Sequence, residues 1–271
     1  MIPVIVDFGT LSVFGVKLHL AIYSYGMMMA IAFLTGAYLV GLELKRKGLP
    51  ESAASTLVFW AAVGGLIGAR LLTIFEEFSE FLHDPVRFIF TGAGFVWYGG
   101  LIGGFVAVTL AMRRLKLPFL QTVDCIAPTL ALGHAIGRIG CQLAGDGDWG
   151  AVSTLPWAMT YPNAIVGWNY PPGVRVHPTP IYETIAYTVV FGILWSLRKR
   201  PHRDGALFWW YLVLASSLRF LVEFVRINPP VAGTLTQAQV ISIVLVSIGV
   251  WRLIVAWAPS TGERSAVRSA S

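Results

Sequence analysis

Seven stretches of about 20 mainly apolar residues recur along the chain, separated by short polar segments. They cover residues 20–42, 54–75, 93–112, 119–140, 180–197, 206–226 and 238–258. A helix needs about 20 apolar residues to cross the hydrocarbon core of a bilayer. The pattern therefore predicts an all-α integral membrane fold, with a seven-helix membrane domain over residues 20–258.

Glycines are concentrated in the second, third and fourth of these stretches. Small residues let two helix backbones approach closely within a lipid bilayer. We therefore expect these three helices to form the packed centre of the bundle. The glycines are Gly64, Gly65 and Gly68; Gly99, Gly100, Gly103 and Gly104; and Gly133, Gly137 and Gly140.

The composition agrees with a membrane protein. Hydrophobic residues make up 56% of the 271 positions and charged residues only 13%. A soluble domain carries about 25% charged residues, so this chain has too little polar surface to face water. The ten tryptophans suit the aromatic belts that form at the two faces of a bilayer.

Basic residues lie mainly on one side of the predicted membrane. Cytoplasmic loops carry an excess of Lys and Arg, so this asymmetry places the N-terminus outside and the C-terminus in the cytoplasm. Because the charges are spread over short loops, the net charge of +6 does not indicate a nucleic-acid partner. One side has twelve, namely Lys45, Arg46, Lys47, Arg113, Arg114, Lys116, Arg198, Lys199, Arg200, Arg203, Arg264 and Arg268, and the other has three, namely Lys17, Arg87 and Arg175.

This orientation divides the rest of the chain. Residues 1–19 become a short external segment, strand-like or amphipathic, and residues 259–271 become a cytoplasmic tail. Residues 141–179 become a long external loop. Its many Trp and Pro residues indicate a segment that lies along the membrane interface.

Arginines at membrane depth are the first candidates for function. An ionisable group there is costly unless it is paired or hydrated. Arg219, Glu223 and Arg226 are spaced so that the carboxylate can bridge both guanidinium groups on one helix face. The trio either fixes helix packing or binds an anionic headgroup, since the planar guanidinium suits phosphate. Arg252 is close enough to the end of its span to reach the interface.

Arg138 lies between Gly137 and Gly140, with Asp146 and Asp148 within one or two helical turns. Two or three arginines converging near the outer leaflet would form a phospholipid headgroup site. Arg70 either joins them or locks two helices together.

Two histidines and a glutamate are the remaining titratable candidates. His134, one turn before Arg138, either faces the same cavity or is a satisfied core residue. His177 is expected to anchor the external loop. Glu183 begins the fifth span, near the positive end of the helix dipole. Cys125 and Cys141 fit no metal-binding spacing, so neither a metal nor a cofactor is expected.

An ordered set of motifs resembles the prolipoprotein diacylglyceryl transferase family of the bacterial inner membrane. The set covers about residues 20–257 and comprises YG at 25–26, GAR at 68–70, YGGLIGG at 98–104, GRIG at 137–140, PWAM at 156–159, HPTPIYE at 177–183 and LRFLVEFVR at 218–226. The resemblance implies transfer of the diacylglyceryl group of phosphatidylglycerol to the lipobox cysteine thiol of a preprolipoprotein, with release of glycerol phosphate. Membrane lipids surround such an enzyme, and no nucleic acid is involved.

The resemblance also implies roles for single residues. Arg138 and Arg219 match the family's essential arginines, which would hold the phosphate and stabilise charge on the leaving group. Tyr25, Gly150 and Glu223 match further positions that the family uses. The expected catalytic residues are Arg138, Arg219, His134 and Tyr98, and the expected substrate-binding residues are Tyr25, Arg70, Arg138, Asp146, Gly150, Arg219 and Glu223.

The chain departs from the family pattern near the reacting thiol. Tyr98 stands where the family has a histidine, Cys141 replaces an asparagine, and Asp146 stands for a glutamate in a segment one residue longer. Tyrosine, with an ordinary pKa near 10, is a poor base at neutral pH. His134 and Asp146 are the alternatives for activating the thiol. Two other functions stay open: transfer from an anionic phospholipid to a different acceptor, and lipid binding without catalysis.

Overall fold

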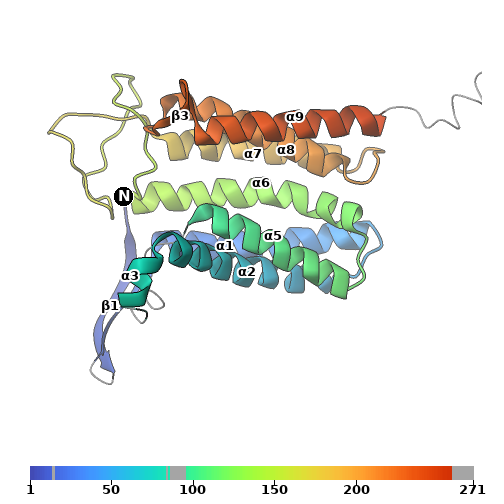
Figure 1. Cartoon of the computed structure of the whole chain (residues 1–271), viewed down its shortest axis with the longest axis horizontal. Coiled ribbons are helices and arrows are strands. Elements are labelled where there is room, and N and C mark those ends of the chain that lie inside the picture. The colour runs from blue at the N-terminus through green and yellow to red at the C-terminus, as the bar shows by residue number, and fades with distance from the viewer. Residues whose placement is uncertain (14–15, 84, 86–95, 258–271) are drawn as a thin grey trace, which may run out of the picture. The chain divides into compact units, whose positions relative to one another are not determined.

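The protein is mostly helical, as a computed structural model shows (Figure 1). The structure describes residues 1–13, 16–83, 85 and 96–257. Arg87, Arg264, Arg268, the predicted tail at 259–271 and the first residues of the third predicted span lie outside the described residues.

A helix occupies each of the seven predicted positions. The long helices are α1 (Ser24–Arg46), α2 (Ala53–Glu76), α5 (Trp97–Arg114), α6 (Phe119–Ala144), α7 (Thr179–Leu197), α8 (Ala206–Val222) and α9 (Gln237–Trp257). The short elements are α3 (Phe78–His83), the 3-10 turn η1 (Glu223–Val225), and the strands β1 (Val4–Val13), β2 (Val16–Tyr23), β3 (Pro230–Ala232) and β4 (Leu235–Thr236).

Among the described residues, six helical stretches are long and apolar enough to cross a membrane: α1, α2, α6, α7, α9 and the stretch Ala206–Val225 that joins α8 to η1. The chain is therefore a multi-pass membrane protein. Helix α5, at the third predicted position, is 18 residues long and is not among the six.

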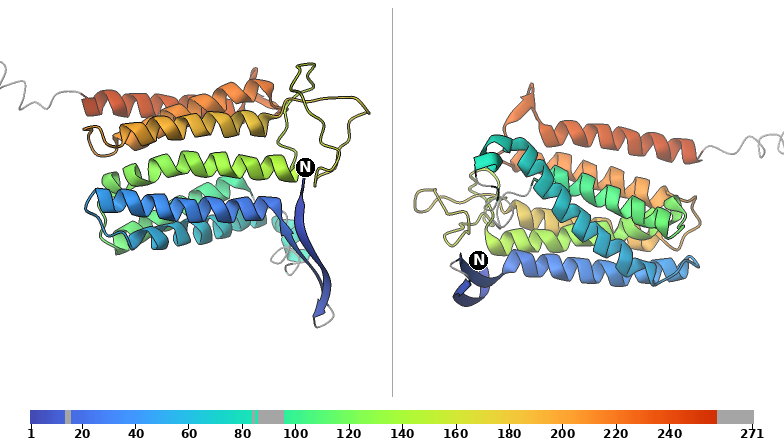
Figure 2. Two further views of the ribbon diagram at one scale, coloured as in Figure 1. Left: turned by 180° about the vertical axis from the view of Figure 1, so that it is seen from behind. Right: turned by 60° about the horizontal axis from the view of Figure 1, so that its bottom comes forward.

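An N-terminal β-hairpin agrees with the strand-like alternative for the external segment, and its second strand continues to Tyr23. Strands β1 and β2 pair antiparallel, and the hairpin extends away from the end of α1 (Figure 2). The first helix begins at Ser24 instead of residue 20, because the apolar residues 20–23 continue β2. Hydropathy alone does not distinguish a short apolar strand from the start of a helix.

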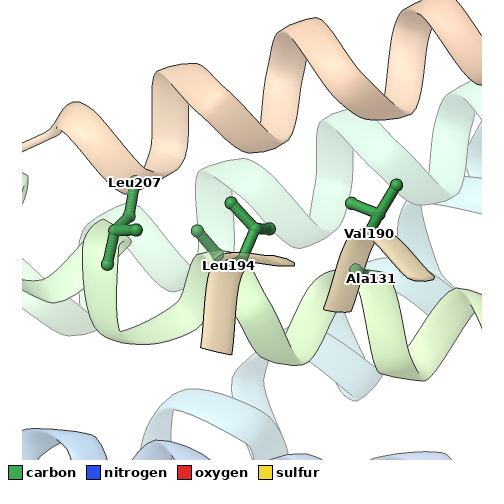
Figure 3. Close-up of a cluster of buried hydrophobic side chains, with 5 residues drawn as sticks. Ala131, Val190, Leu194 and Leu207 are labelled. Atoms are coloured by element: carbon green, nitrogen blue, oxygen red, sulfur yellow. The ribbon is translucent and has the colours of Figure 1, made fainter. Parts of the chain in front are cut away.

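The chain divides into two compact units, each described by itself. The first unit comprises residues 1–32 and the described residues from 127 onward. In it α7 packs on α8 and α8 packs on α9. Its apolar core joins residues of α6, α7 and α8 (Figure 3). The buried members are Ala127, Ala131, Val190, Leu194 and Leu207.

The second unit, residues 33–126, is built on the contact between α2 and α5. A Cβ atom on Gly68 would lie 2.8 Å from the Cα of Gly103, which is closer than real side chains approach. The prediction of close glycine packing is therefore confirmed for these two helices. In the first unit, Gly140 of α6 packs on Tyr25 of α1.

Candidate functional site

Three arginines and three carboxylates meet in the first unit. They come from segments far apart in the sequence, which the packing of α6, α7 and α8 brings together. They are Arg138 on α6, Asp148 in the loop that follows it, Glu183 on α7, Arg219 on α8, Glu223 in η1, and Arg226 directly after η1.

Glu183 is the carboxylate that joins all three arginines. Its side chain is fully buried. Oε2 lies 2.9 Å from Arg138 Nε and 3.7 Å from Arg226 Nη1, while Oε1 accepts a hydrogen bond of 3.1 Å from Arg219 Nη1. Burying a carboxylate costs several kcal/mol, and nearby guanidinium groups can offset a cost of this size. Glu183 thus fixes the positions of three cations at once.

Arg219 and Glu223 form the ion pair that their spacing predicts. Arg219 Nη2 lies 2.8 Å from Glu223 Oε2, and Arg226 Nε lies 3.9 Å from the same oxygen. The second oxygen, Oε1, accepts a hydrogen bond of 2.6 Å from Asn228 Nδ2. The prediction that Glu223 bridges Arg219 and Arg226 is therefore confirmed. The two nitrogens Nη1 and Nη2 of Arg219 both lie on fully buried carboxylates.

Asp148 bridges the other two arginines. Its Oδ2 pairs with Arg138 Nη1, and its Oδ1 lies 2.5 Å from Arg226 Nη2. Burial alone would raise the pKa of the Asp148 carboxyl, but the charges of Arg138 and Arg226 outweigh burial and lower this pKa below its usual value. The carboxylate therefore stays ionised at neutral pH.

Gly150 lets the loop backbone reach this cluster. Its N–H donates a hydrogen bond of 2.8 Å to the carbonyl of His177, and it forms an isolated bridge with Arg226. A Cβ atom at this position would lie 2.9 Å from Thr179 Cγ2 and 3.0 Å from His177 Cβ. Any larger residue would push the loop, and Asp148 with it, away from Arg226.

The loop between α6 and α7 begins at Gly145 instead of residue 141, because α6 continues to Ala144. His177 anchors it as predicted: its Nδ1 lies 3.2 Å from the Tyr182 hydroxyl, which also accepts a 2.8 Å hydrogen bond from Trp157 Nε1. Burial raises the pKa of Tyr161 to about 12, so its hydroxyl stays protonated and donates to Gln142 Oε1 at 2.9 Å. These contacts hold the loop over the end of α6.

His134 is packed among aromatic side chains. Its ring stacks on Tyr187 with centroids 4.7 Å apart, and Nδ1 lies 3.4 Å from the Tyr211 hydroxyl. This environment agrees with the alternative of a satisfied core residue. Tyr25, at the start of α1, lies against Gly140, two residues beyond Arg138. It is therefore near Arg138, and its expected role in substrate binding stays a prediction.

Tyr98 and Arg70 belong to the second unit, on α5 and α2. Both are half-buried and both have interaction partners. The cluster belongs entirely to the first unit, so its geometry neither includes nor excludes these two residues. Their expected roles stay predictions.

Cys141, Asp146 and Asp148 bring three potential metal ligands within 4.8 Å of one another. Arg138 Nη1, however, lies 3.7 Å from Cys141 Sγ and also pairs with Asp148. A guanidinium cation therefore already contacts two of the three potential ligands. Asp146 accepts a hydrogen bond of 3.3 Å from the Asp148 N–H, so it supports the turn that carries Asp148.

Sequence reasoning missed the central position of Glu183. Its place near a helix N-terminus suggested an interaction with the helix dipole, whereas its partners are three arginines on other elements. One signal was available: an acidic residue inside an apolar span requires a partner of opposite charge.

Comparison with known proteins identifies the family. The sequence model of the family described as Prolipoprotein diacylglyceryl transferase matches residues 12–255. A phosphatidylglycerol–prolipoprotein diacylglyceryl transferase of Clostridium tetani is 32% identical over 88% of this chain and 93% of its own length. Proteins of the same name from Teredinibacter turnerae and Nitratidesulfovibrio vulgaris are 33% and 36% identical, covering 91% and 85% of this chain and 87% and 88% of their own lengths. The chain belongs to the prolipoprotein diacylglyceryl transferase family.

Proposed function

We propose that this chain is an enzyme that transfers the diacylglyceryl group of phosphatidylglycerol to the lipobox cysteine thiol of a prolipoprotein. The bond between the glyceryl carbon and the phosphate oxygen breaks, a carbon–sulfur bond forms, and glycerol phosphate leaves. The thiol proton passes to a base. The observation that carries the proposal is the family match over residues 12–255, with relatives of this name aligned over most of the chain.

The arginine cluster supplies the chemistry that this reaction requires. The phosphodiester of phosphatidylglycerol carries one negative charge, and the departing phosphate monoester develops a second. Guanidinium groups held in place before the reaction stabilise such developing charge without reorganisation. Arg138 and Arg219, the arginines expected from the resemblance, both contact Glu183, so their separation is fixed in advance.

The site belongs at the outer face of a bacterial inner membrane under this proposal. The asymmetry of basic residues supports seven spans with the N-terminus outside, with α5 as the third span. Residues 1–19 and the loop before α7 then lie outside, residues 20–258 form the membrane domain, and residues 259–271 lie in the cytoplasm. The bacterial origin of the relatives agrees with this location.

Cysteine labelling tests the orientation. Thr154 and Lys199 are both exposed, one in the loop before α7 and the other directly after that helix. In intact cells, an impermeant maleimide should label a Thr154→Cys variant and leave a Lys199→Cys variant unlabelled until the membrane is opened. The reverse pattern would contradict the proposed orientation.

Two experiments test the reaction. The gene should restore growth to a bacterium depleted of its own transferase, because growth requires the complete reaction. The purified protein should transfer radiolabelled diacylglyceryl from phosphatidylglycerol to a lipobox peptide, and a Cys→Ser peptide is the matched control. Consumption of phosphatidylglycerol without peptide modification would favour another acceptor, for which the Tyr98 and Cys141 departures are the motivating observations.

A further inference from the structure

Asp148 differs from the other two carboxylates of the cluster. The side chains of Glu183 and Glu223 are fully buried, whereas that of Asp148 is 28% exposed. Glu183 lies within a helix and Glu223 in a helical turn, while Asp148 follows Gly147, which has a φ of 93°. Of the three carboxylates, Asp148 is therefore the one that can leave its partners at the smallest cost.

The arginines differ in the same way. Arg219 directs both terminal nitrogens at the fully buried Glu183 and Glu223. Arg138 and Arg226 each direct one terminal nitrogen at Asp148, one to each carboxylate oxygen. A phosphodiester also has two free oxygens, and it binds guanidinium groups through the same charge-assisted hydrogen bonds.

We propose that the Asp148 carboxylate holds the position that the donor phosphate takes, and that the phosphatidylglycerol phosphate displaces it to bridge Arg138 and Arg226. This inference rests on the proposed function. Arg226 then becomes a binding residue for the donor. Arg219 stays on Glu183 and Glu223 and positions the others, which revises the expected pairing of Arg138 with Arg219.

Charge balance supports the exchange. Three arginines pair with three carboxylates, so these six side chains together carry no net charge. Moving the Asp148 carboxylate away leaves one uncompensated positive charge, which matches the single negative charge of a phosphodiester. With all three carboxylates in place, these side chains would offer that phosphate no net positive charge.

The backbone can stay in place during the exchange. The Asp148 carbonyl accepts hydrogen bonds from Thr179 Oγ1 and, at 3.3 Å, from Arg226 Nη1. The Asp148 N–H is held by Asp146 Oδ1. Rotation of this one short side chain between staggered positions would therefore break its carboxylate contacts with Arg138 and Arg226 without unfolding the loop.

Direct binding of phosphatidylglycerol tests this proposal without an acceptor. Native mass spectrometry of the full-length protein in detergent would give the apparent Kd for phosphatidylglycerol, with phosphatidylcholine as control. We expect Asp148→Asn to bind phosphatidylglycerol roughly 3- to 10-fold more tightly, because a neutral amide competes less strongly than a carboxylate for Arg138 and Arg226. Arg226→Gln should weaken binding by a similar factor and should abolish the gain from Asp148→Asn in the double variant.

A second binding experiment identifies the part of the lipid that the site recognises. Soluble glycerol 1-phosphate should compete with phosphatidylglycerol, and its own Kd, measured without phosphatidylglycerol, should be lower for Asp148→Asn than for the wild type. A Kd for glycerol 1-phosphate that is the same for the two proteins would mean that the headgroup does not take the Asp148 position.

Weaker binding by folded Asp148→Asn and Asp148→Ser variants would overturn the proposal, because Asp148 would then order the arginines. If neither variant folds, Arg226→Lys provides the test, because lysine keeps the positive charge but cannot donate two parallel hydrogen bonds. Unchanged phosphatidylglycerol binding by Arg226→Lys would overturn the proposal, and weaker binding would support it. A wild type that binds phosphatidylglycerol without modifying the peptide would refute only the proposed acceptor. A wild type that modifies the peptide while folded Asp148 variants bind more weakly would refute only this inference.

Discussion

Substituting Glu183 by glutamine should separate the positioning of the arginines from their charge. The change keeps the volume of the side chain but removes the carboxylate whose oxygens lie 2.9, 3.1 and 3.7 Å from three guanidinium nitrogens. The cluster then holds three cations and two anions, and mutual repulsion should move Arg138 and Arg219 apart. A displacement of about 1 Å at a reacting centre can cost about 100-fold in rate.

The cost in stability follows from the same contacts. Removing one partner of a buried ion pair costs about 3–5 kcal/mol. Two features reduce this value: glutamine still accepts one hydrogen bond, and the arginine side chains are 11–25% exposed, so water screens their repulsion. We expect Glu183→Gln to lose about 2–3 kcal/mol.

Transfer to a lipobox peptide and the rate of thermal inactivation in detergent would measure both effects. We expect kcat to fall about 10- to 100-fold with little rise in the KM for phosphatidylglycerol, because the site gains positive charge while it loses alignment. Glu43→Gln is a matched control: Glu43 is buried in the second unit and pairs with Arg46 at 2.7 Å. It should lose stability while keeping its turnover. Turnover of Glu183→Gln within threefold of the wild type, or an equal loss in Glu43→Gln, would refute the reasoning.

Three further predictions concern the same site. Arg138→Lys and Arg219→Lys should each lower transfer at least about 100-fold in a folded protein, because lysine loses the bidentate fork; full activity in both would leave only a packing role. His134→Gln should lower turnover more than Tyr98→Phe does, and Tyr98→His should be tolerated; a pH profile of kcat unchanged in His134→Gln would remove this histidine as the base. Because the pKa of Asp148 is lowered, its ion pairs stabilise the fold above the ordinary carboxyl pKa, and this stabilisation is lost as the pH falls through the lowered value. Inactivation rates measured between pH 3 and 7 should therefore rise more steeply toward acid pH in the wild type than in Asp148→Asn.

The helices could be predicted because each apolar run is long enough by itself to indicate a membrane-spanning helix. Their ends could not, since hydropathy does not report where backbone geometry changes. The stretch predicted as 206–226 is one example: α8 ends at Val222 and Glu223–Val225 forms a 3-10 turn. The apolar residues 20–23 are another, because they belong to β2.

The candidate site was predictable where its contacts are local. The four-residue spacing of Arg219 and Glu223 determines that their side chains meet on one helix face. The contact of Arg138 with Glu183 joins two helices 45 positions apart, so it depends on how α6 packs against α7. No spacing rule reports that packing. The only local sign is the cost of leaving either charge unpaired within an apolar span.

That cost also explains why a site for an anionic lipid should contain carboxylates at all. Three arginines converging in a low-dielectric environment would repel one another and would each require a partner. Glu183 and Glu223 supply permanent partners, which hold the guanidinium groups apart at fixed distances. A third permanent partner would leave no positive charge for the substrate, and without a third partner the arginines would repel one another before the lipid binds. A partly exposed aspartate beside a glycine meets both requirements, because it balances the arginines and can give way to a phosphate.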